Sequence, residues 1–256
     1  MRKHLKKILI ALAALVVVVI AASFIYAKFF NKADKEFTTK DVKDRLTTTV
    51  APAPTGSTPT DSAPAGTDAA TTVPNGTTAP AGAGVDGNWA IADGSEVGYR
   101  VDESINGFDT TANGRTKSVT GQFTIDGTTV SAGEFTVDMT TFKSDESRRD
   151  GQFNGRIMSV DQFPTATFTL TAPIDFQQVP TDGTTITASA TGNLTLHGVT
   201  KPVTFDVEAT FQNGRVGVTG QIPVIFADFG IPNPSFATVT TEDHGVLEFL
   251  LIFDRA

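Results

Sequence analysis

Residues 186–211, ITASATGNLTLHGVTKPVTFDVEATF, contain the pattern that decides the fold. On both sides of His197-Gly198, small or apolar side chains alternate with polar ones. Successive side chains of a β-strand point to opposite faces, so each half predicts a strand with one apolar and one polar face. We therefore expect a hairpin whose apolar face is covered by the rest of a β-domain.

The same two-residue period returns in six further segments. The eight predicted strands cover residues 97–102, 119–125, 134–139, 165–172, 186–196, 202–211, 215–222 and 246–254. Asp126-Gly127, Asp182-Gly183 and Asn213-Gly214 supply the positive φ angles that tight hairpins need. Short connections and the need to protect sheet edges predict an all-β fold, an eight-stranded antiparallel up-and-down barrel. A two-sheet sandwich is the structural alternative.

Residues 144–163 interrupt the alternation. Ser144 or Asp145 can cap a helix, and Phe153 lies four residues before Ile157 in a modest apolar stripe. Pro164 disfavours continuation of a helix. We expect one short helix over one opening of the barrel.

The amino terminus has the pattern of a membrane segment. Residues 1–7 are basic and predict a cytoplasmic flank, while residues 8–27 carry no charge. About 20 residues of helix span about 30 Å, enough to cross a membrane once. The alternative is a signal peptide cleaved near Ala21-Ala22-Ser23, which would leave the protein secreted or periplasmic, but the run exceeds the usual length. Both readings place the domain outside the cytoplasm.

Two segments of different composition separate this run from the predicted barrel. Residues 28–46 are a charged juxtamembrane segment that suits a short helix. Residues 47–87 are almost only Thr, Ala, Pro, Gly and Ser, too poor in large apolar side chains to offset the entropy of ordering. We expect a disordered linker with a mean span of about 35 Å. The folded domain is expected over residues 88–256.

Charge and cysteine content exclude several classes of function. From Gly87 onward the chain has 10 basic and 21 acidic residues, a net charge of −11, so a nucleic-acid partner is not expected. The chain has no Cys, which excludes disulfides, thiolate metal sites and a Cys nucleophile. No cofactor is predicted.

Three motifs resemble the YceI-like family in order and spacing. They are Arg149-Asp150, residues 162–168 (QFPTATF) and residues 192–203 (GNLTLHGVTKPV). The resemblance implies a lipocalin-like eight-stranded barrel whose members bind polyisoprenoids or similar long amphiphiles in a tunnel, usually outside the cytoplasm. The family follows Arg-Asp with His-Leu and Phe-Phe pairs, where this chain has Gln152-Phe153 and Ile157-Met158. The covering helix and the head-group contacts therefore need not match those of the family.

The inward-facing apolar side chains are the candidates for lipid contact. The predicted tunnel wall is Phe123, Phe135, Val137, Phe168, Leu170, Leu194, Phe205, Val207, Phe249 and Leu251. Small residues on the same faces are expected to leave volume unfilled: Ala188, Ala190, Gly192, Gly121 and Gly220. The residues alone fit a solid core and a hollow tunnel equally well. The resemblance favours the tunnel, with Arg149 and Asp150 as candidate contacts of a polar head group.

Histidines offer little support for catalysis. His197 falls in the predicted hairpin turn, and Glu242-Asp243-His244 are adjacent residues, which rarely converge on one ion. We predict no catalytic and no metal site, and a function in extracytoplasmic binding, sequestration or transport of a polyisoprenoid or similar lipid. One alternative is a solid-core interaction module displayed on a stalk. A second is an extracytoplasmic enzyme that uses Asp150, His197 or His244.

Overall fold

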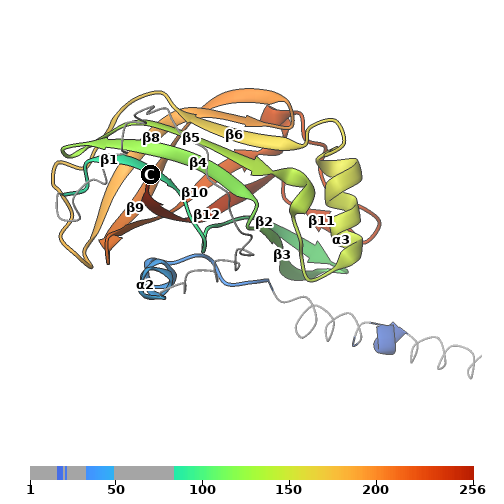
Figure 1. The fold of residues 1–256 in the computed structure, drawn as a ribbon. Coiled ribbons are helices and arrows are strands. Elements are labelled where there is room, and N and C mark those ends of the chain that lie inside the picture. The colour runs from blue at the N-terminus through green and yellow to red at the C-terminus, as the bar shows by residue number, and fades with distance from the viewer. Residues whose placement is uncertain (1–15, 20, 22–32, 49–83) are drawn as a thin grey trace, which may run out of the picture.

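The computed structural model describes residues 16–19, 21, 33–48 and 84–256, and this part of the chain forms one antiparallel sheet of twelve strands (Figure 1). The strands are β1 Gly87–Ile91, β2 Glu96–Ile105, β3 Phe108–Thr116, β4 Val119–Asp126, β5 Thr129–Asp138, β6 Thr165–Leu170, β7 Ile174–Asp175, β8 Thr185–Leu196, β9 Val199–Gln212, β10 Arg215–Ile225, β11 Val239–Thr241 and β12 His244–Arg255. The helical segments are α2 Thr39–Thr47, η2 Met139–Thr141, α3 Ser147–Gln152, η3 Phe153–Ile157 and η4 Phe226–Phe229.

Eight of these strands close into a barrel. The order is β1-β4-β5-β6-β8-β9-β10-β12, and β12 pairs again with β1 from Trp89↔Arg255 to Ile91↔Phe253. The hairpin of β8 and β9 is paired from Thr185↔Thr210 to Leu196↔Val199, as the alternation of residues 186–211 predicts. The all-β, eight-stranded antiparallel barrel is therefore confirmed.

The membership of the ring differs from the prediction in one strand. Residues 97–102 belong to β2, which pairs with the first half of β12, while β1 pairs with its second half and closes the ring. β1 and β2 pair one after the other with the same edge of β12, and between them the backbone N–H of Ile252 donates to Ser95 Oγ at 2.9 Å. The strand β3, which the alternation did not reveal, forms a hairpin with β2 through Asn106-Gly107, both at positive φ.

The two ends of the barrel are built differently. At the turn end lie the β4–β5 and β9–β10 turns, and Trp89 is fully buried there with its indole N–H donating to Val85 O at 2.8 Å. At the other end lie α3, η3 and the β2–β3 hairpin (Figure 1). We call this second end the arginine end, after Arg148, Arg149 and Arg156, which line a cavity there.

Residues 34–47, here called the strap, lie on the outer face of the barrel (Figure 1). Val42 and Leu46 of α2 are 1% and 2% exposed and pack with Leu250 and Ile252 of β12, both 0% exposed. A Cβ on Gly217 of β10 would lie 2.3 Å from Val42 Cγ1, so the helix sits directly on the glycine. The sequence predicts a short helix within residues 28–46 but not this packing against the barrel.

A buried carboxylate lies beneath the strap. Glu248 of β12 is fully buried, and its Oε1 accepts hydrogen bonds from Arg115 Nη2 at 2.9 Å and Arg115 Nε at 3.2 Å. The Arg115 guanidinium lies 4.0 Å from the centroid of the Phe37 ring in the strap. Burial raises the pKa of Glu248, whereas the hydrogen bonds and charge of Arg115 lower it.

The predicted membrane segment, residues 8–27, lies outside the described residues except for residues 16–19 and 21, which are helical. Within the described part, no helix has the length and apolar character needed to cross a membrane. Residues 49–83, most of the predicted linker, also lie outside the described part.

The buried Arg115–Glu248 pair predicts a pH-dependent loss of stability. Arg115→Met removes the ion-pair partner of the buried Glu248 carboxylate, and we expect a loss of about 3 kcal/mol near pH 7 by urea denaturation. The folded-state pKa of Glu248, already raised, rises further without Arg115. The penalty is present above that pKa and disappears as pH falls through it, so the deficit against the wild type is smaller at acid pH than at pH 7.

The control is Arg215→Met. Its pair with Asp254, at 2.5 Å, involves a carboxylate that is more than half exposed, so we expect a loss of about 1 kcal/mol or less at both pH values. A deficit of Arg115→Met that is independent of pH would contradict the role assigned to Glu248.

Candidate functional site

The interior of the barrel contains a cavity of about 190 Å³, the first cavity. Its wall is almost entirely carbon and comes from strands around the ring. All ten residues predicted as tunnel wall line it: Phe123, Phe135, Val137, Phe168, Leu170, Leu194, Phe205, Val207, Phe249 and Leu251. The lining also reaches Gly127, Gln178 and Pro180 at the turn end. The barrel is therefore hollow between its apolar side chains.

Phenylalanine rings set the shape of this wall. Phe205 lies edge-to-face against Phe168, with ring centroids 5.4 Å apart, and against Phe249, with centroids 5.9 Å apart. Phe168 is directly opposite Phe135 on β5 and Leu194 on β8. Because aromatic rings have few rotamers and favour such contacts, they form a stiff wall.

The inward-facing glycines do not leave empty space, and the expectation that they do is wrong. A Cβ on Gly192 would lie 2.3 Å from Phe168 Cζ, and a Cβ on Gly220 would lie 2.5 Å from Phe249 Cζ. Gly121 is covered in the same way by Phe135, the residue opposite it on β5. Each ring therefore lies over a glycine of a neighbouring strand, which leaves the middle of the barrel open.

A second cavity, of about 700 Å³, lies at the arginine end. It shares four lining residues with the first: Met139, Phe142, Leu196 and Leu247. Its wall combines apolar side chains such as Ile105 and Phe236 with charged ones such as Glu103 and Arg149. A carbon-lined space therefore adjoins a space with charged groups.

The short helix predicted within residues 144–163 forms part of the second cavity. It consists of α3 and a π-helical turn, η3, and Phe153 at their junction stacks on Tyr99 at 4.8 Å between ring centroids. The cap is Glu146, whose side chain accepts from Arg148 N, rather than Ser144 or Asp145 as predicted. Burial raises the pKa of Tyr99, so this hydroxyl stays protonated at neutral pH.

The two candidate head-group residues point to different places. Arg149 lines the second cavity and forms ion pairs with Glu103, at 3.5 Å, and with Asp145. Asp150 accepts hydrogen bonds from the backbone N–H and the hydroxyl of Ser144, both at 2.8 Å. It therefore holds the loop before α3 and is not among the residues that line the second cavity.

Sequence reasoning missed most of the second cavity. Arg156 donates to Pro234 O at 2.7 Å, which ties η3 to the segment between η4 and β11. Tyr99 and Phe236 come from other segments again. No periodic pattern links these residues, so only the tertiary structure brings them together.

His197 lies in the β8–β9 turn with φ at 51°, followed by Gly198 at 75°. Its ring lies edge-on to Phe163, 4.6 Å between centroids, and its Nδ1 is 3.2 Å from Phe229 O. These contacts account for the imidazole as a structural element of the turn. Neither the first nor the second cavity is lined by Asp150, His197 or His244.

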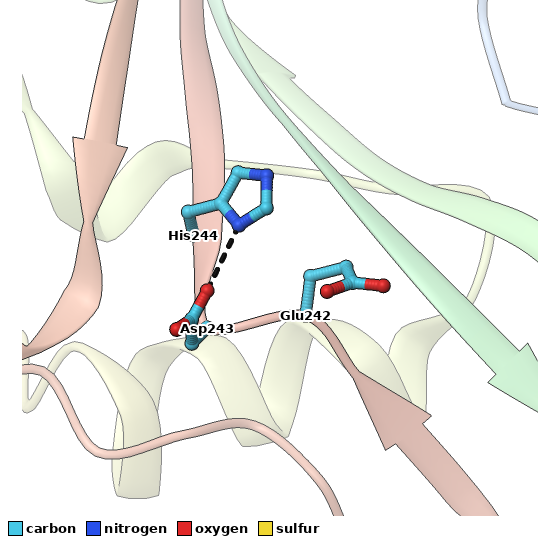
Figure 2. A group of neighbouring side chains, drawn as sticks. All are labelled: Glu242, Asp243 and His244. Atoms are coloured by element: carbon cyan, nitrogen blue, oxygen red, sulfur yellow. Dashed lines mark hydrogen bonds and ion pairs between the residues drawn. The ribbon is translucent and has the colours of Figure 1, made fainter.

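Glu242, Asp243 and His244 lie at the β11–β12 junction, with one ligand atom from each within 4.8 Å of the others (Figure 2). All three are exposed, and His244 Nδ1 is 2.9 Å from Asp243 Oδ1. This hydrogen bond raises the pKa of His244. In Figure 2 the dashed line joins His244 to Asp243 alone, and because all three side chains are exposed the group has the character of a solvated turn.

Residues 89–253 match the YceI-like domain. The chain belongs to the YceI-like domain family. It is 35% identical over 108 residues to a UPF0312 protein of Pseudomonas putida (strain W619), a match covering 39% of this chain and 52% of that protein. It is 48% identical over 63 residues to a UPF0312 protein of Pseudomonas fluorescens (strain SBW25), covering 21% and 32%. The matched segments thus span about half and a third of these two curated relatives.

The fold was also compared with solved structures, and one of those found shares it. A polyisoprenoid-binding domain from Saccharophagus degradans, implicated in plant cell wall breakdown, superposes with a TM-score of 0.52 at 14% identity. The match covers 66% of this chain and 98% of that domain. BcnA of Burkholderia cenocepacia gives a TM-score of 0.49 at 22% identity, over 62% and 95% of the two chains. At such identities the likeness concerns the fold alone.

The ring-over-glycine contacts give a stability prediction. Gly192→Ala places a methyl group against Phe168 and 2.5 Å from the backbone oxygen of Thr169, which cannot move easily. We expect a loss of about 1–3 kcal/mol in the free energy of unfolding, measured by urea denaturation. The control, Gly155→Ala, meets nothing within 4 Å and should change stability by about 0.5 kcal/mol or less. Equal effects of the two substitutions would show that the ring does not rest on Gly192.

Proposed function

We propose that this YceI-like protein binds a polyisoprenoid or a similar long-chain amphiphilic lipid, which it sequesters or transports. The observation that carries the proposal is a carbon-lined cavity within the barrel that adjoins a cavity with charged side chains. This order of surfaces matches a molecule with an apolar tail and a polar head. The shared fold with a polyisoprenoid-binding domain supports the same ligand class.

The driving force would be burial of the apolar tail. Each buried CH₂ group contributes about 0.8 kcal/mol, so a chain of many carbons binds tightly without hydrogen bonds along its length. The stiff aromatic wall keeps the space open before the ligand arrives, which lowers the cost of ordering side chains on binding.

The polar head would lie at the arginine end. Arg149 faces the second cavity while Glu103 and Asp145 hold its guanidinium in position. Arg148 and Arg156 line the same cavity. A guanidinium donates up to five hydrogen bonds, so these groups suit a head with oxygen acceptors.

Two observations favour binding over the alternatives. The stalk-displayed module with a solid core requires a filled interior, whereas the barrel contains a cavity. The enzyme alternative requires Asp150, His197 or His244 to converge, and these residues have separate partners: Ser144, Phe229 and Asp243. We therefore propose a binding protein without catalysis.

We further propose that residues 8–27 anchor the protein in a cell membrane, with the barrel on the extracytoplasmic side. Val16, Val17, Val18 and Val19 of this run are helical and at least half exposed, as expected of a helix that meets an apolar environment. Cleavage after a signal peptide remains the alternative, and it would leave a secreted or periplasmic barrel. The excess of acidic residues in the barrel argues against a nucleic-acid partner.

The tail site is tested with a charge placed inside or outside the barrel. Phe205→Asp puts a carboxylate into the first cavity, whereas Thr204→Asp adds the same charge on the exposed face of the same strand. We expect Phe205→Asp to abolish lipid binding because an unpaired charge opposes an apolar tail, while Thr204→Asp keeps it. The measurement is native mass spectrometry of the full chain purified in mild detergent, followed by organic extraction and titration with a prenyl lipid.

Equal loss of lipid in both variants would contradict binding of the lipid inside the barrel. If Phe205→Asp does not fold, Ala190→Phe serves instead, because Ala190 lines the first cavity and a larger side chain fills it without adding charge. A wild-type protein that carries no lipid and takes up none on titration would refute the proposal.

The head site is tested with two neighbouring residues of α3. Arg149→Met removes the guanidinium from the second cavity, and we expect about tenfold weaker lipid binding because charge-assisted hydrogen bonds are lost. Asp150→Asn should bind as the wild type does, because Asp150 serves the Ser144 loop. Lipid titration by native mass spectrometry compares them; unchanged affinity in Arg149→Met would remove Arg149 from the site.

A further inference from the structure

The strap runs along the outer face of the barrel from the arginine end toward the turn end. Arg45 forms an ion pair with Glu96 at the start of β2, at 2.7 Å, and Asp34 N donates to Asn113 Oδ1 at 3.2 Å. Asn113 is opposite Arg100, further along β2. Since β2 continues from there to Ile105, which lines the second cavity, the strap read backward from α2 runs toward the arginine end.

Both ends of residues 49–83 are held at the opposite end of the barrel. Before them, Leu46 O accepts from Asn213 Nδ2 of the β9–β10 turn at 3.3 Å. After them, Gly84 O accepts from Arg255 Nη2 at 2.7 Å, and Asp86 accepts from Gly127 N of the β4–β5 turn at 2.6 Å. The described residues on both sides of this segment therefore lie at the turn end.

The outer face of the barrel is built to receive the strap. Leu250 and Ile252 point outward from β12 and would meet water without Val42 and Leu46. Gly217 leaves room for the helix, and Arg115 reaches across to Lys35 O and to the Phe37 ring. Apolar side chains, a glycine that leaves room for the helix and a partly buried cation together make an interaction surface that fits this segment.

We propose that the strap is the attachment between the barrel and the amino-terminal segment, and that residues 48–84 form a loop closed at both ends on the barrel. Only residues 28–33 then separate the strap from the apolar run, a reach of about 20 Å at most when extended. If residues 47–87 were instead a disordered linker between the membrane segment and the barrel, the mean distance between the two would be about 35 Å and the barrel would have no fixed orientation.

Orientation follows from this attachment, and this part of the inference rests on the proposed membrane anchor. The strap begins on the side of the arginine end, with Asp34 beside Asn113, and few residues separate it from the apolar run, so we infer that this end faces the bilayer. A lipid could then pass between the bilayer and the second cavity over a short distance, head group nearest the membrane surface.

The attachment is tested by cutting the loop. A protease site is placed between residues 60 and 65 of the full chain, with an affinity tag at the amino terminus, and the cut protein is passed over the affinity resin at micromolar concentration. We expect the barrel to stay with the tagged piece. Release of the barrel from the cut wild-type chain would overturn the proposal.

Matched variants assign the contact to α2. Val42→Asp combined with Leu46→Asp places charges against Leu250 and Ile252, and we expect retention of the cut barrel to fall about tenfold or more. Lys40→Asp, on the exposed side of the same helix, should retain it. Full retention by the double variant would overturn the assignment. If that variant does not fold, Val42→Ala with Leu46→Ala is used, with partial release expected.

Orientation is tested by fluorescence quenching in vesicles with brominated acyl chains. Trp89, the single native tryptophan, is fully buried and gives a constant background. Phe236→Trp reports from the second cavity and Val179→Trp from the loop at the turn end, positions that are 65% and 48% exposed. We expect several-fold stronger quenching at position 236, and loss of that difference in the Val42→Asp, Leu46→Asp background. Equal quenching in the wild-type background would overturn the orientation.

The readouts separate this inference from the proposed function. Vesicle flotation reports the membrane anchor alone, and quenching is measured on the floated protein. Phe205→Asp, expected to lose lipid, should keep its barrel on the resin after the cut, because Phe205 lies inside the barrel and the strap lies outside. Loss of retention in that variant would contradict a strap that holds independently of the ligand.

Discussion

The strand β12 is buried on both faces, and the rest of the structure depends on covering both. Its inward side chains, including Phe249 and Phe253, complete the wall of the barrel, while Leu250 and Ile252 point outward. It also pairs with three strands, β10, β2 and β1, so it joins the ring to the β2–β3 hairpin. A strand buried on both faces is usual in a layered α/β protein but needs an added element on a barrel. The strap is that element.

Inside the barrel, three phenylalanine rings lie over glycines of neighbouring strands. Rings that lie over Gly121, Gly192 and Gly220 stay close to the wall, because no Cβ holds them away from the neighbouring strand. The same rings pointing to the axis would meet and fill it, as in an ordinary core. Cross-strand packing thus stabilises the sheet and keeps a ligand-sized space open with the same side chains.

Much of the barrel could be predicted from the sequence because period-two alternation is a local signal. It located the β8–β9 hairpin and the ten side chains that line the first cavity. It missed β3, whose residues Phe108–Thr116 are mostly polar and pair outside the ring. It also assigned β2 to the eight-stranded ring in place of β1, because the five residues of β1 are too few to show a period clearly.

The second cavity and the strap were beyond local patterns for a different reason. The cavity combines β2, α3, η3 and the segment before β11, which no shared period connects. The strap had a signal that went unused: outward Leu250 and Ile252 on a strand of an otherwise polar-faced barrel require a partner. Composition could not identify the partner, because Val42 and Leu46 lie among charged residues that resemble a solvated segment.

The closed loop also bears on how such a protein can change over generations. Because Leu46 and Gly84 are both held at the turn end, insertions or deletions within residues 49–83 would, with the proposed attachment, alter neither the barrel nor its distance from the amino-terminal segment. Doubling the length of a closed loop costs only about 0.6 kcal/mol. The length and composition of this segment can therefore change without effect on the barrel. The six residues before the strap, 28–33, set the distance between the strap and the apolar run, so selection would have to preserve their number.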